Sequence, residues 1–323
     1  MHKKLKVLYS PSEEAMNLKN NIKNKLLLLV NHLNWINSDW EDRSLLIQAK
    51  TLMSSISWRN QQDPFDLTSK EFRVFSQWGD DGIIQYLIHV LHIENKNFIE
   101  FGVGNYYESN THFLLVNNNW SGFVIDGSQK CIDIVRNNPF FWRYDLSLKT
   151  AFINKENIND ILLESDFENI GLLHIDLDGN DYWILDSLDM NKYGPDILIL
   201  EYNSNFGPER SITVPYDPLF SCINAHYSGQ YFGASISALD SLAQQKGYYY
   251  IGSNSSGNNA YFLKNKFSNI IPSQKIDECF VPAKFRDERN QNGQLLFSSR
   301  ESCINSIRGL PVFNINTNKI EDF

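Results

Sequence analysis

The sequence is poor in cysteine and contains no apolar run long enough to cross a membrane. Its 323 residues include four cysteines, at positions 131, 222, 279 and 303, and none of them belongs to a CxxC pair. This spacing argues against a disulfide framework or a zinc site and favours reduced thiols. The apolar run at residues 26–30 is far shorter than the ~20 residues of a membrane span. Since the basic start is not followed by a signal-peptide pattern, we expect a cytoplasmic protein.

Positive charge is also scarce. The formal net charge is −9 and the isoelectric point is about 5.3, which argues against non-specific binding to nucleic acid.

Apolar residues, in contrast, are plentiful. Hydrophobic residues make up 42% of the chain and aromatic residues 13%, which is enough for a large core.

A glycine-containing stretch at residues 97–126 has the pattern of a strand, a helix and a second strand in a nucleotide-binding sheet. The first strand carries Glu100 and breaks at Gly102 and Gly104, and Asp126 ends the second strand. The glycines let the backbone approach a ligand, and the acid can accept hydrogen bonds from both ribose hydroxyls. We therefore predict a cofactor site here, which also includes the adjoining Asn105 and Gly127.

The glycine pattern differs from that of dinucleotide-binding proteins. The third glycine of G-x-G-x-x-G is missing, because position 107 is a tyrosine. A pyrophosphate needs the closely packed helix that this glycine permits, and the Glu100 carboxylate would repel a phosphate. These features argue against a nucleotide-dependent oxidoreductase and favour a nucleoside ligand without phosphates.

A polar turn at residues 75–82 lies directly before the first strand and leads into a helix at 83–91. Asp81 can cap this helix, where a carboxylate suits the helix dipole. Alternatively, Gln77 and Asp81 approach the cofactor, because the turn precedes the first strand. Both interpretations stay open at this point, and we name the two residues as candidate cofactor ligands.

Acids and one amide follow two later strands, at the point where each strand ends. Asp176 and Asp178 come after a strand at 172–175, and Glu201 and Asn203 follow the next strand. Open α/β sheets bind ligands at this edge, so we expect these side chains to converge. Their oxygens suit Mg²⁺, Mn²⁺ or Ca²⁺, with Asp176, Glu201 and Asn203 as the predicted metal ligands. The alternative is that they cap helices and bind substrate without a metal.

Candidates for a catalytic base come from two histidines and the same acids. His174 lies inside a strand and is expected to be a hydrogen-bonded core residue. His226 lies in a loop before Tyr231 and is a better candidate, and Asp178 is the other choice. Together with Asp176, these two residues make up the predicted catalytic set.

The order of the predicted elements indicates an α/β fold with a mostly parallel sheet. Five strands alternate with helices, and two more follow as a hairpin-like pair, at 98–101, 123–125, 150–153, 172–175, 196–200, 248–251 and 260–263. A five-stranded parallel wind that ends in an antiparallel strand resembles the Rossmann-like fold of class I S-adenosylmethionine-dependent methyltransferases. We assign this seven-stranded core to residues 69–264.

Two segments flank the predicted core. Residues 1–68 form a helical accessory segment, with amphipathic patterns at 17–34 and 45–53, which suggests a lid or the arm of a homodimer. Residues 265–323 form a C-terminal extension with a possible edge strand at 310–315.

Four stretches of the core are similar to the FkbM-type branch of these methyltransferases, which includes sugar O-methyltransferases and bacterial surface-polysaccharide modifiers. They are residues 75–82, 98–126, 175–183 and 199–203. The resemblance implies methyl transfer from S-adenosyl-L-methionine to a sugar hydroxyl, often with a divalent metal. It implies cofactor binding by Glu100, Gly102, Gly104 and Asp126, and metal binding by Asp176 and Glu201.

Other functions stay open at this stage. The sugar acceptor could be nucleotide-linked or part of a capsule or surface polysaccharide. A metal-independent N-methyltransferase of an amino sugar or small amine uses the same chemistry, and a non-catalytic partner protein with this fold is a different class. The expected partner is a small-molecule sugar substrate, with no nucleic acid and no membrane span.

Overall fold

The computed structural model describes residue 25 and residues 40–55, 66–139 and 141–323. The chain divides into two compact units, Met1–Arg59 and Asn60–Phe323, and each is described by itself. In the first unit residues 40–54 are helical, which confirms the helix predicted at 45–53. The helix predicted at 17–34 lies outside the described residues except for Lys25. Throughout the described ranges, every helix is too short or too polar to span a bilayer.

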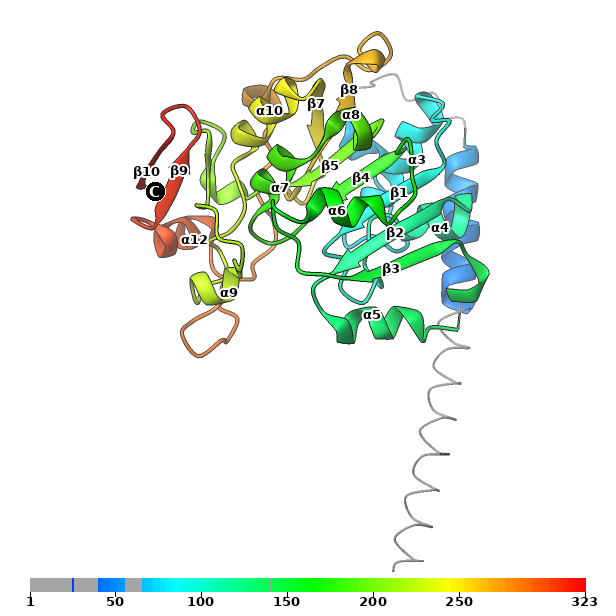
Figure 1. Ribbon diagram of the computed structural model, residues 1–323, viewed down its shortest axis with the longest axis horizontal. Helices are drawn as coiled ribbons and strands as arrows, with labels where there is room; N and C mark the ends of the chain where they lie inside the picture. The colour runs from blue at the N-terminus through cyan, green and yellow to red at the C-terminus, as the bar shows by residue number, and fades with distance from the viewer. Residues whose placement is uncertain (1–24, 26–39, 56–65, 140) are drawn as a thin grey trace, which may run out of the picture. The chain divides into compact units, whose positions relative to one another are not determined.

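The second unit is built on a seven-stranded sheet with the order β3-β2-β1-β4-β5-β8-β7 (Figure 1). Six strands run parallel, and only β8 is antiparallel to both of its neighbours. The strands are β1 (Asn97–Phe101), β2 (Ser121–Asp126), β3 (Leu146–Thr150), β4 (Leu172–Ile175), β5 (Ile197–Glu201), β7 (Tyr248–Ser253) and β8 (Asn259–Lys264).

The strand order identifies the fold. The last strand of the sheet in the sequence, β8, inserts between β5 and β7 and pairs with both in antiparallel fashion. A five-stranded parallel wind closed in this way is the topology of class I methyltransferases, so the predicted fold class is confirmed. A hairpin loop joins β7 to β8, and the Asn254 side-chain oxygen accepts hydrogen bonds from three of its backbone amides.

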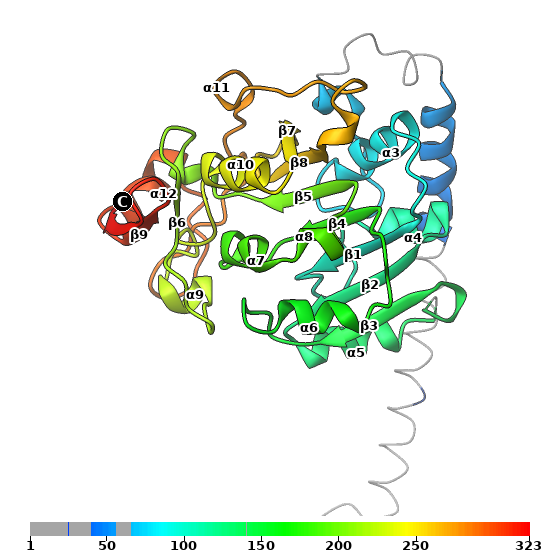
Figure 2. The same ribbon diagram turned by 45° about the horizontal axis from the view of Figure 1, so that its top comes forward.

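Helices cover both faces of the sheet (Figure 2). On one face, residues such as Ile99 and Leu173 pack against α6 (Ile158–Leu163), α7 (Asp181–Ser187) and α10 (Ile236–Gln245) in the largest apolar core. Because successive side chains of a strand alternate, Glu100 and His174 point to the opposite face. The remaining helices are α3 (Asp80–Val90), α4 (His112–Asn118), α5 (Gln129–Arg136), α8 (Met190–Tyr193), α9 (Cys222–Ala225), α11 (Ile276–Cys279), α12 (Arg300–Ile307), and the 3₁₀ turns η1 (Leu67–Lys70), η2 (Phe141–Arg143), η3 (Ser204–Phe206) and η4 (Asn265–Phe267).

The C-terminal residues build a second, three-stranded sheet with the order β10-β9-β6. Its strands are β6 (Ile212–Thr213), β9 (Pro311–Asn314) and β10 (Lys319–Asp322). The strand predicted at 310–315 is therefore confirmed, but its prediction as an edge strand is wrong. β9 is the middle strand, because β6 from the loop after β5 pairs with it. The division into residues 1–68, 69–264 and 265–323 stays a prediction.

The predicted third strand is wrong in position. β3 ends at Thr150, whereas the sequence interpretation placed the strand at 150–153. That interpretation followed the apolar run from Ala151 to Ile153, which lies beyond the strand end. These side chains are apolar because they line a cavity at the edge of the sheet, and not because they form a strand.

Candidate active site

The glycine turn after β1 brings the ends of two strands together. Gly102 and Gly104 have φ values of +74° and +53°, in the left-handed region that favours glycine. A Cβ atom on Gly102 would clash with the backbone carbonyl oxygen of Asp176, at the end of β4. The Gly104 amide donates a hydrogen bond to Asp126 Oδ2 at 2.7 Å, so the acid at the end of β2 holds the turn. The sequence-predicted residues therefore meet at one edge of the sheet.

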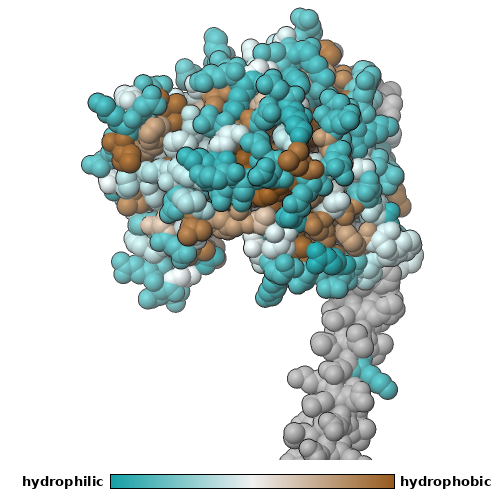
Figure 3. Space-filling model, viewed as in Figure 1, coloured by the Kyte–Doolittle hydropathy of each residue, from teal (hydrophilic) through white to brown (hydrophobic). Residues whose placement is uncertain are grey.

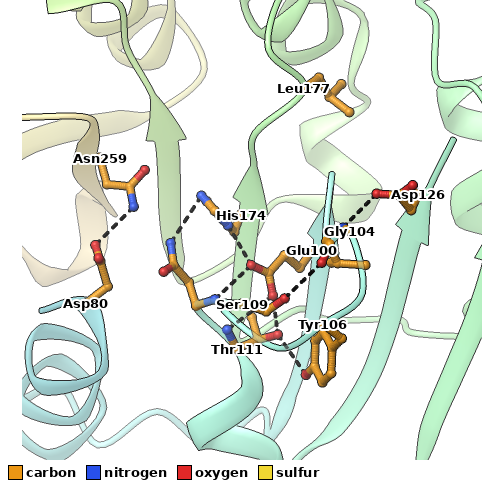
Figure 4. A network of polar contacts seen from close by, with 12 residues as sticks. Asp80, Glu100, Gly104, Tyr106, Ser109, Thr111, Asp126, His174, Leu177 and Asn259 are labelled. Carbon is orange, nitrogen blue, oxygen red and sulfur yellow. Dashed lines mark hydrogen bonds and ion pairs between the residues drawn. The ribbon is translucent and has the colours of Figure 1, made fainter. Parts of the chain in front are cut away.

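Glu100 lies beneath this turn and is almost completely buried (Figure 4). Its Oε1 accepts hydrogen bonds from the Asn110 amide at 3.0 Å and from His174 Nδ1 at 2.9 Å. Its Oε2 accepts from the amide and the hydroxyl of Thr111. The carboxylate thereby binds the backbone just before α4, which begins at His112.

The same network confirms that His174 is a hydrogen-bonded core residue. Burial opposes charge on Glu100, but the hydrogen bonds and the charge of His174 outweigh burial and lower the pKa of Glu100. Burial alone would lower the pKa of His174, but the hydrogen bond and charge of Glu100 raise it. The pair joins β1 to β4 and to the backbone just before α4.

A cavity of about 290 Å³ opens at this edge of the sheet, between the glycine turn and the loops after β2, β3 and β4. In the space-filling view the molecule is hollowed between the segments of α9 and α5 (Figure 3). The cavity is lined by Gly102, Gly104, Ile125, Asp126, Gly127, Ala151, Phe152, Ile153, Asp176, Leu177, Asp178, Asn180 and Phe220. Six of the predicted site residues therefore share one cavity.

A second, smaller cavity of about 50 Å³ shares Gly102 and Asp176 with the first. Its lining includes Gln77, one of the candidate cofactor ligands, together with Glu100 and the buried Asn259. The two cavities therefore adjoin each other at these two residues.

Asp81 lines neither cavity. Its Oδ2 accepts hydrogen bonds from the amides of Val74, Phe75 and Ser76 at 2.7, 2.7 and 3.0 Å. Burial raises its pKa to about 7. The structure thus places this acid where it orders the turn before α3. Asn105 is exposed, and its side-chain oxygen accepts the Tyr107 amide.

Three carboxylates converge at the ends of β4 and β5. Oxygens of Asp176, Asp178 and Glu201 all lie within 4.8 Å of one another. Burial, followed by the charge of Asp178, raises the pKa of Asp176 to about 7. Burial also raises the pKa values of Glu201 and Asp178, with neighbouring carboxylates adding to the effect. Such mutual repulsion is what a bound cation relieves.

The donor set fits a hard divalent cation. Glu201 is 9% exposed, and its Oε2 is buried without a hydrogen-bond partner among the described residues. An unsatisfied buried carboxylate oxygen is costly, and coordination of Mg²⁺ or Mn²⁺ by Asp176, Asp178 and Glu201 would satisfy it. These residues therefore fit a metal.

Asn203 and His226 also lie outside the lining of the two cavities. The Asn203 amide nitrogen donates to the carbonyl oxygens of Gln230 and Phe232, and its oxygen accepts the Asn205 amide. Its side chain is thus engaged in the loop after β5, whereas Asp178 joins the other two acids. His226 is half-buried, contacts the Ser228 hydroxyl at 2.7 Å, and is not among the residues that line the two cavities. Burial lowers its pKa.

Sequence reasoning missed Asp181 and the aromatic walls of the cavity. Asp181 is buried and accepts the amides of Leu177 and Gly179, which shapes the loop that carries Asp178 at a φ of +52°. The sequence pattern that could have pointed to Asp181 is its position in the first turn of a helix, five residues after Asp176. Phe152 and Phe220 come from loops far apart in the chain, so no local pattern could identify them as neighbours of one cavity.

No family model matches the chain, and no curated protein matches it. Among solved structures, it is similar to a putative caffeoyl-CoA O-methyltransferase from Staphylococcus aureus, with 14% identity, a TM-score of 0.42 and coverage of 69% of this chain and 98% of that one. It is also similar to an O-methyltransferase from Bacillus cereus in complex with SAH, with 14% identity, a TM-score of 0.39 and coverage of 68% of this chain and 97% of that one. A third similar structure is an S-adenosylmethionine-dependent methyltransferase from Clostridium acetobutylicum, with 9% identity, a TM-score of 0.37 and coverage of 57% of this chain and 90% of that one. Since all three TM-scores are below 0.5, we base the fold assignment on the strand order.

Proposed function

We propose that this protein is an S-adenosylmethionine-dependent O-methyltransferase of the FkbM type that methylates a sugar hydroxyl with the help of a divalent metal. One observation carries the proposal. A single cavity is lined by the glycine turn and Asp126 and also by Asp176 and Asp178, two acids of the three-carboxylate cluster. The first side suits a nucleoside without phosphates, and the second suits activation of a hydroxyl.

Some residues around the cavity would bind the cofactor, and others would bind the acceptor. Asp126 is placed to accept hydrogen bonds from ribose hydroxyls, and Gly127 and Phe152 would flank the adenine. The glycine turn lets the cofactor approach the backbone of β1. Asp176 lines both cavities and belongs to the acid cluster.

The acids supply the chemistry at the acceptor. A divalent metal held by Asp176, Asp178 and Glu201 would lower the pKa of a coordinated hydroxyl. Transfer of a methyl group to that oxygen releases a proton, and Asp178 is the exposed acid of the cluster that can accept it. Orientation of the acceptor against the methyl group contributes most of the remaining acceleration.

The lining residues also bear on the class of sugar. Among the described residues of the two cavities there is no lysine or arginine, and several are acids. A diphosphate would be repelled by this charge. We therefore favour an uncharged sugar of a surface polysaccharide over a nucleotide-linked one as the acceptor. Location in the cytoplasm and a homodimer stay predictions.

The decisive test is titration calorimetry of S-adenosylhomocysteine into the full chain, first with a chelator and then with Mn²⁺ or Mg²⁺. We expect micromolar binding of the nucleoside in at least one condition. If no heat is detected in any of them, the methyltransferase proposal is wrong, and a non-catalytic partner protein becomes the better account.

Asp176→Asn tests the division of roles. We expect this variant to lose methyl transfer while its affinity for S-adenosylhomocysteine stays within about tenfold of the original, because asparagine keeps an acceptor oxygen. Loss of both properties would place Asp176 in the cofactor site or in the fold.

A metal-independent N-methyltransferase of an amino sugar or small amine is the second candidate. The acid cluster favours it, because three carboxylates can bind an ammonium group as well as a metal. Turnover of an amine substrate that survives exhaustive chelation would support this alternative. Turnover that requires Mn²⁺ or Mg²⁺ would support the O-methyltransferase.

A further inference from the structure

A segment of the C-terminal extension is tied to the loops at the carboxyl edge of the sheet. We call this segment, residues 283–289, the strap. Its backbone amides donate hydrogen bonds to the turn after β5 at Ser204, to the β7–β8 hairpin at Ser256 and to the loop after α9 at Ser228, over 2.8, 2.9 and 3.1 Å. Because β5 and β7 run in the same direction, their ends lie at one edge. Both ends of the strap are therefore held at the edge that carries the acid cluster.

Two side-chain contacts fix the middle of the strap. Phe285 stacks on Trp78 of the turn before α3, with 6.0 Å between the ring centroids and an interplanar angle of 22°. Asp287 Oδ1 accepts a hydrogen bond from Gln230 Nε2 at 2.8 Å. Gln230 is buried, and its side-chain oxygen accepts Asn205 Nδ2 at 2.9 Å. The donor that holds the Asp287 carboxylate is thus itself fixed.

The Asp287 carboxylate lies close to the acid cluster. Burial raises the pKa of Asp178, and the charge of Asp287 raises it further. Burial, followed by the charges of Asp178 and Asp287, raises the pKa of the Cys222 thiol to about 11. Charges act on each other over short distances only, so these three side chains are neighbours. Asp287 is exposed, and its Oδ2 has no hydrogen-bond partner in the described part of the chain, which leaves an acceptor for a ligand.

The acids give this place a negative charge, although the strap also carries three cations. Arg289 Nη1 donates a hydrogen bond to the Gly293 carbonyl oxygen at 3.0 Å. Burial raises the pKa of Glu71, and the charge of Lys284 opposes this effect, which places Lys284 near Glu71. Arg286 is exposed, so solvent screens its charge. A place bordered by two carboxylates accepts hydrogen bonds from hydroxyl groups and repels a carboxylate.

We propose that Asp287 is an acceptor-binding residue that makes the protein select a neutral sugar over a sugar with a carboxylate. The inference rests on the proposed function. Asp287 Oδ2 accepts a hydrogen bond from one hydroxyl of the sugar, while the acid cluster binds the hydroxyl that receives the methyl group. A sugar carboxylate at the same position meets the like charges of Asp287 and Asp178. The C-terminal extension, outside the seven-stranded sheet, thereby determines which acceptor is used.

Pairs of sugars that differ at one exocyclic carbon test this role. Methyl β-D-glucopyranoside has a hydroxymethyl group there, methyl β-D-glucuronide has a carboxylate, and the galacto series offers a second pair. Transfer of a tritiated methyl group from S-adenosylmethionine by the full chain with Mn²⁺ gives kcat/KM for each sugar. We expect the unmodified chain to prefer the neutral sugar at least about tenfold, and Asp287→Asn to lower this preference at least about fivefold, because it removes the repelling charge.

Asp277→Asn is the matched control. It makes the same change in net charge at an exposed position of α11 in the same extension, so the preference should stay within about twofold of the original. Asp287→Asn keeps an oxygen for the contact with Gln230. Its affinity for S-adenosylhomocysteine should therefore stay within about twofold as well. If Asp287→Asn does not fold in a thermal melt, Asp287→Ser replaces it with the same expected result.

Each outcome decides the proposal. A preference that falls in Asp287→Asn and persists in Asp277→Asn supports the acceptor-binding role. An equal loss of transfer to both sugars would assign Asp287 to the fold, and an unchanged preference would mean that it does not meet the sugar; either result overturns the inference while the proposed function survives. If the unmodified chain binds S-adenosylhomocysteine but methylates no sugar of either pair, the inference is wrong together with the sugar acceptor. If it does not bind S-adenosylhomocysteine, the methyltransferase function is wrong too.

Discussion

At the scale of single residues, the site depends on close approaches between backbones. Gly102 is the strongest example, because its φ is +74° and any side chain would meet the carbonyl oxygen of Asp176. A backbone atom cannot move aside as a flexible side chain can, so β1 and β4 would have to separate. The requirement for glycine here is therefore structural as well as functional.

Gly102→Ala should destabilise the protein by about 3 kcal/mol or more, since it combines left-handed strain with a clash in the core. Gly104→Ala is the matched control. Its φ is +53°, but a Cβ there meets nothing within 4 Å, so we expect a loss of about 1 kcal/mol. Urea unfolding measures both variants. Equal losses would contradict the role of the Asp176 contact.

The surroundings of His112 disfavour the protonated form of its ring. Its ring stacks between Phe75, at 4.1 Å, and Tyr106, at 4.9 Å. Burial lowers its pKa from 6.5 to about 4, although the nearby Glu100 charge acts in the opposite direction. The unfolded chain therefore binds a proton between pH 6.5 and pH 4 that the folded chain does not.

The pH dependence of stability follows from this difference. The stabilising effect of the neutral ring is complete above pH 6.5 and is lost as the pH falls towards 4, by about 3 kcal/mol in all. His112→Phe keeps the stacking and removes the titration. Urea unfolding at several pH values between 7.5 and 4 should show a shallower decline for this variant than for the unmodified chain. Parallel declines would show that His112 is not the cause.

At the scale of elements, the ends of β4 and β5 assemble the acids. The two strands are neighbours in register, with Ile175 paired to Leu200, so the residues that follow them are brought together. Asp176, Asp178 and Glu201 repel one another in a partly buried place. Such a cluster opposes folding unless a cation is bound.

Glu201→Gln should stabilise the chelated protein by about 1 kcal/mol, because it removes a buried carboxylate oxygen that has no partner among the described residues. In the unmodified chain, Mn²⁺ at a hundred times its Kd should raise the free energy of unfolding by about 2.7 kcal/mol. The variant should lose most of this stabilisation. Thermal unfolding with and without Mn²⁺ measures both effects.

Glu209→Gln is the control for the change in net charge, since Glu209 is exposed and lies in a nearby loop. It should respond to Mn²⁺ as the unmodified chain does. If Glu201→Gln retains the full stabilisation by Mn²⁺, Glu201 is not a metal ligand.

At the scale of the whole molecule, the C-terminal extension belongs to the same compact unit as the core. β9 pairs with β6, which lies in the loop after β5, and a small apolar core forms around them. That core includes Phe206, Ile212, Val214, Tyr231, Ile307 and Val312. The extension also crosses the core at Val281, whose carbonyl oxygen accepts the Tyr202 hydroxyl.

Removal of residues 265–323 should therefore abolish cooperative unfolding, because it deletes two of the six residues of the small core, Ile307 and Val312, exposes the other four and takes β9 away from β6. Removal of β10 alone should have a smaller effect, since β9 still pairs with β6. Circular dichroism melts and size-exclusion chromatography measure both truncations. An unchanged cooperative melt without residues 265–323 would show that the core is independent of the extension.

The sequence by itself determined the sheet and the residues at its carboxyl edge. Apolar runs bounded by Gly, Pro or acids place β1, β4 and β5 within one residue of their observed limits. The order of strands also predicted that the last strand, β8, is antiparallel, because a hairpin after a parallel wind reverses the chain. Gly102, Gly104, Asp126, Asp176, Asp178 and Glu201 stand at strand ends, a local feature that sequence spacing reveals.

Only the tertiary structure decided what these side chains contact. Glu100 turned out to bind the start of α4, Asp81 the turn before α3, and Asn203 the loop after β5. Strands distant in the sequence also determine where β3 begins and ends and why β9 is a middle strand, because β3 pairs with β2 and β9 pairs with β6. Strand ends follow from local periodicity, but hydrogen-bond partners, cavity walls and sheet neighbours depend on long-range packing that one sequence does not display.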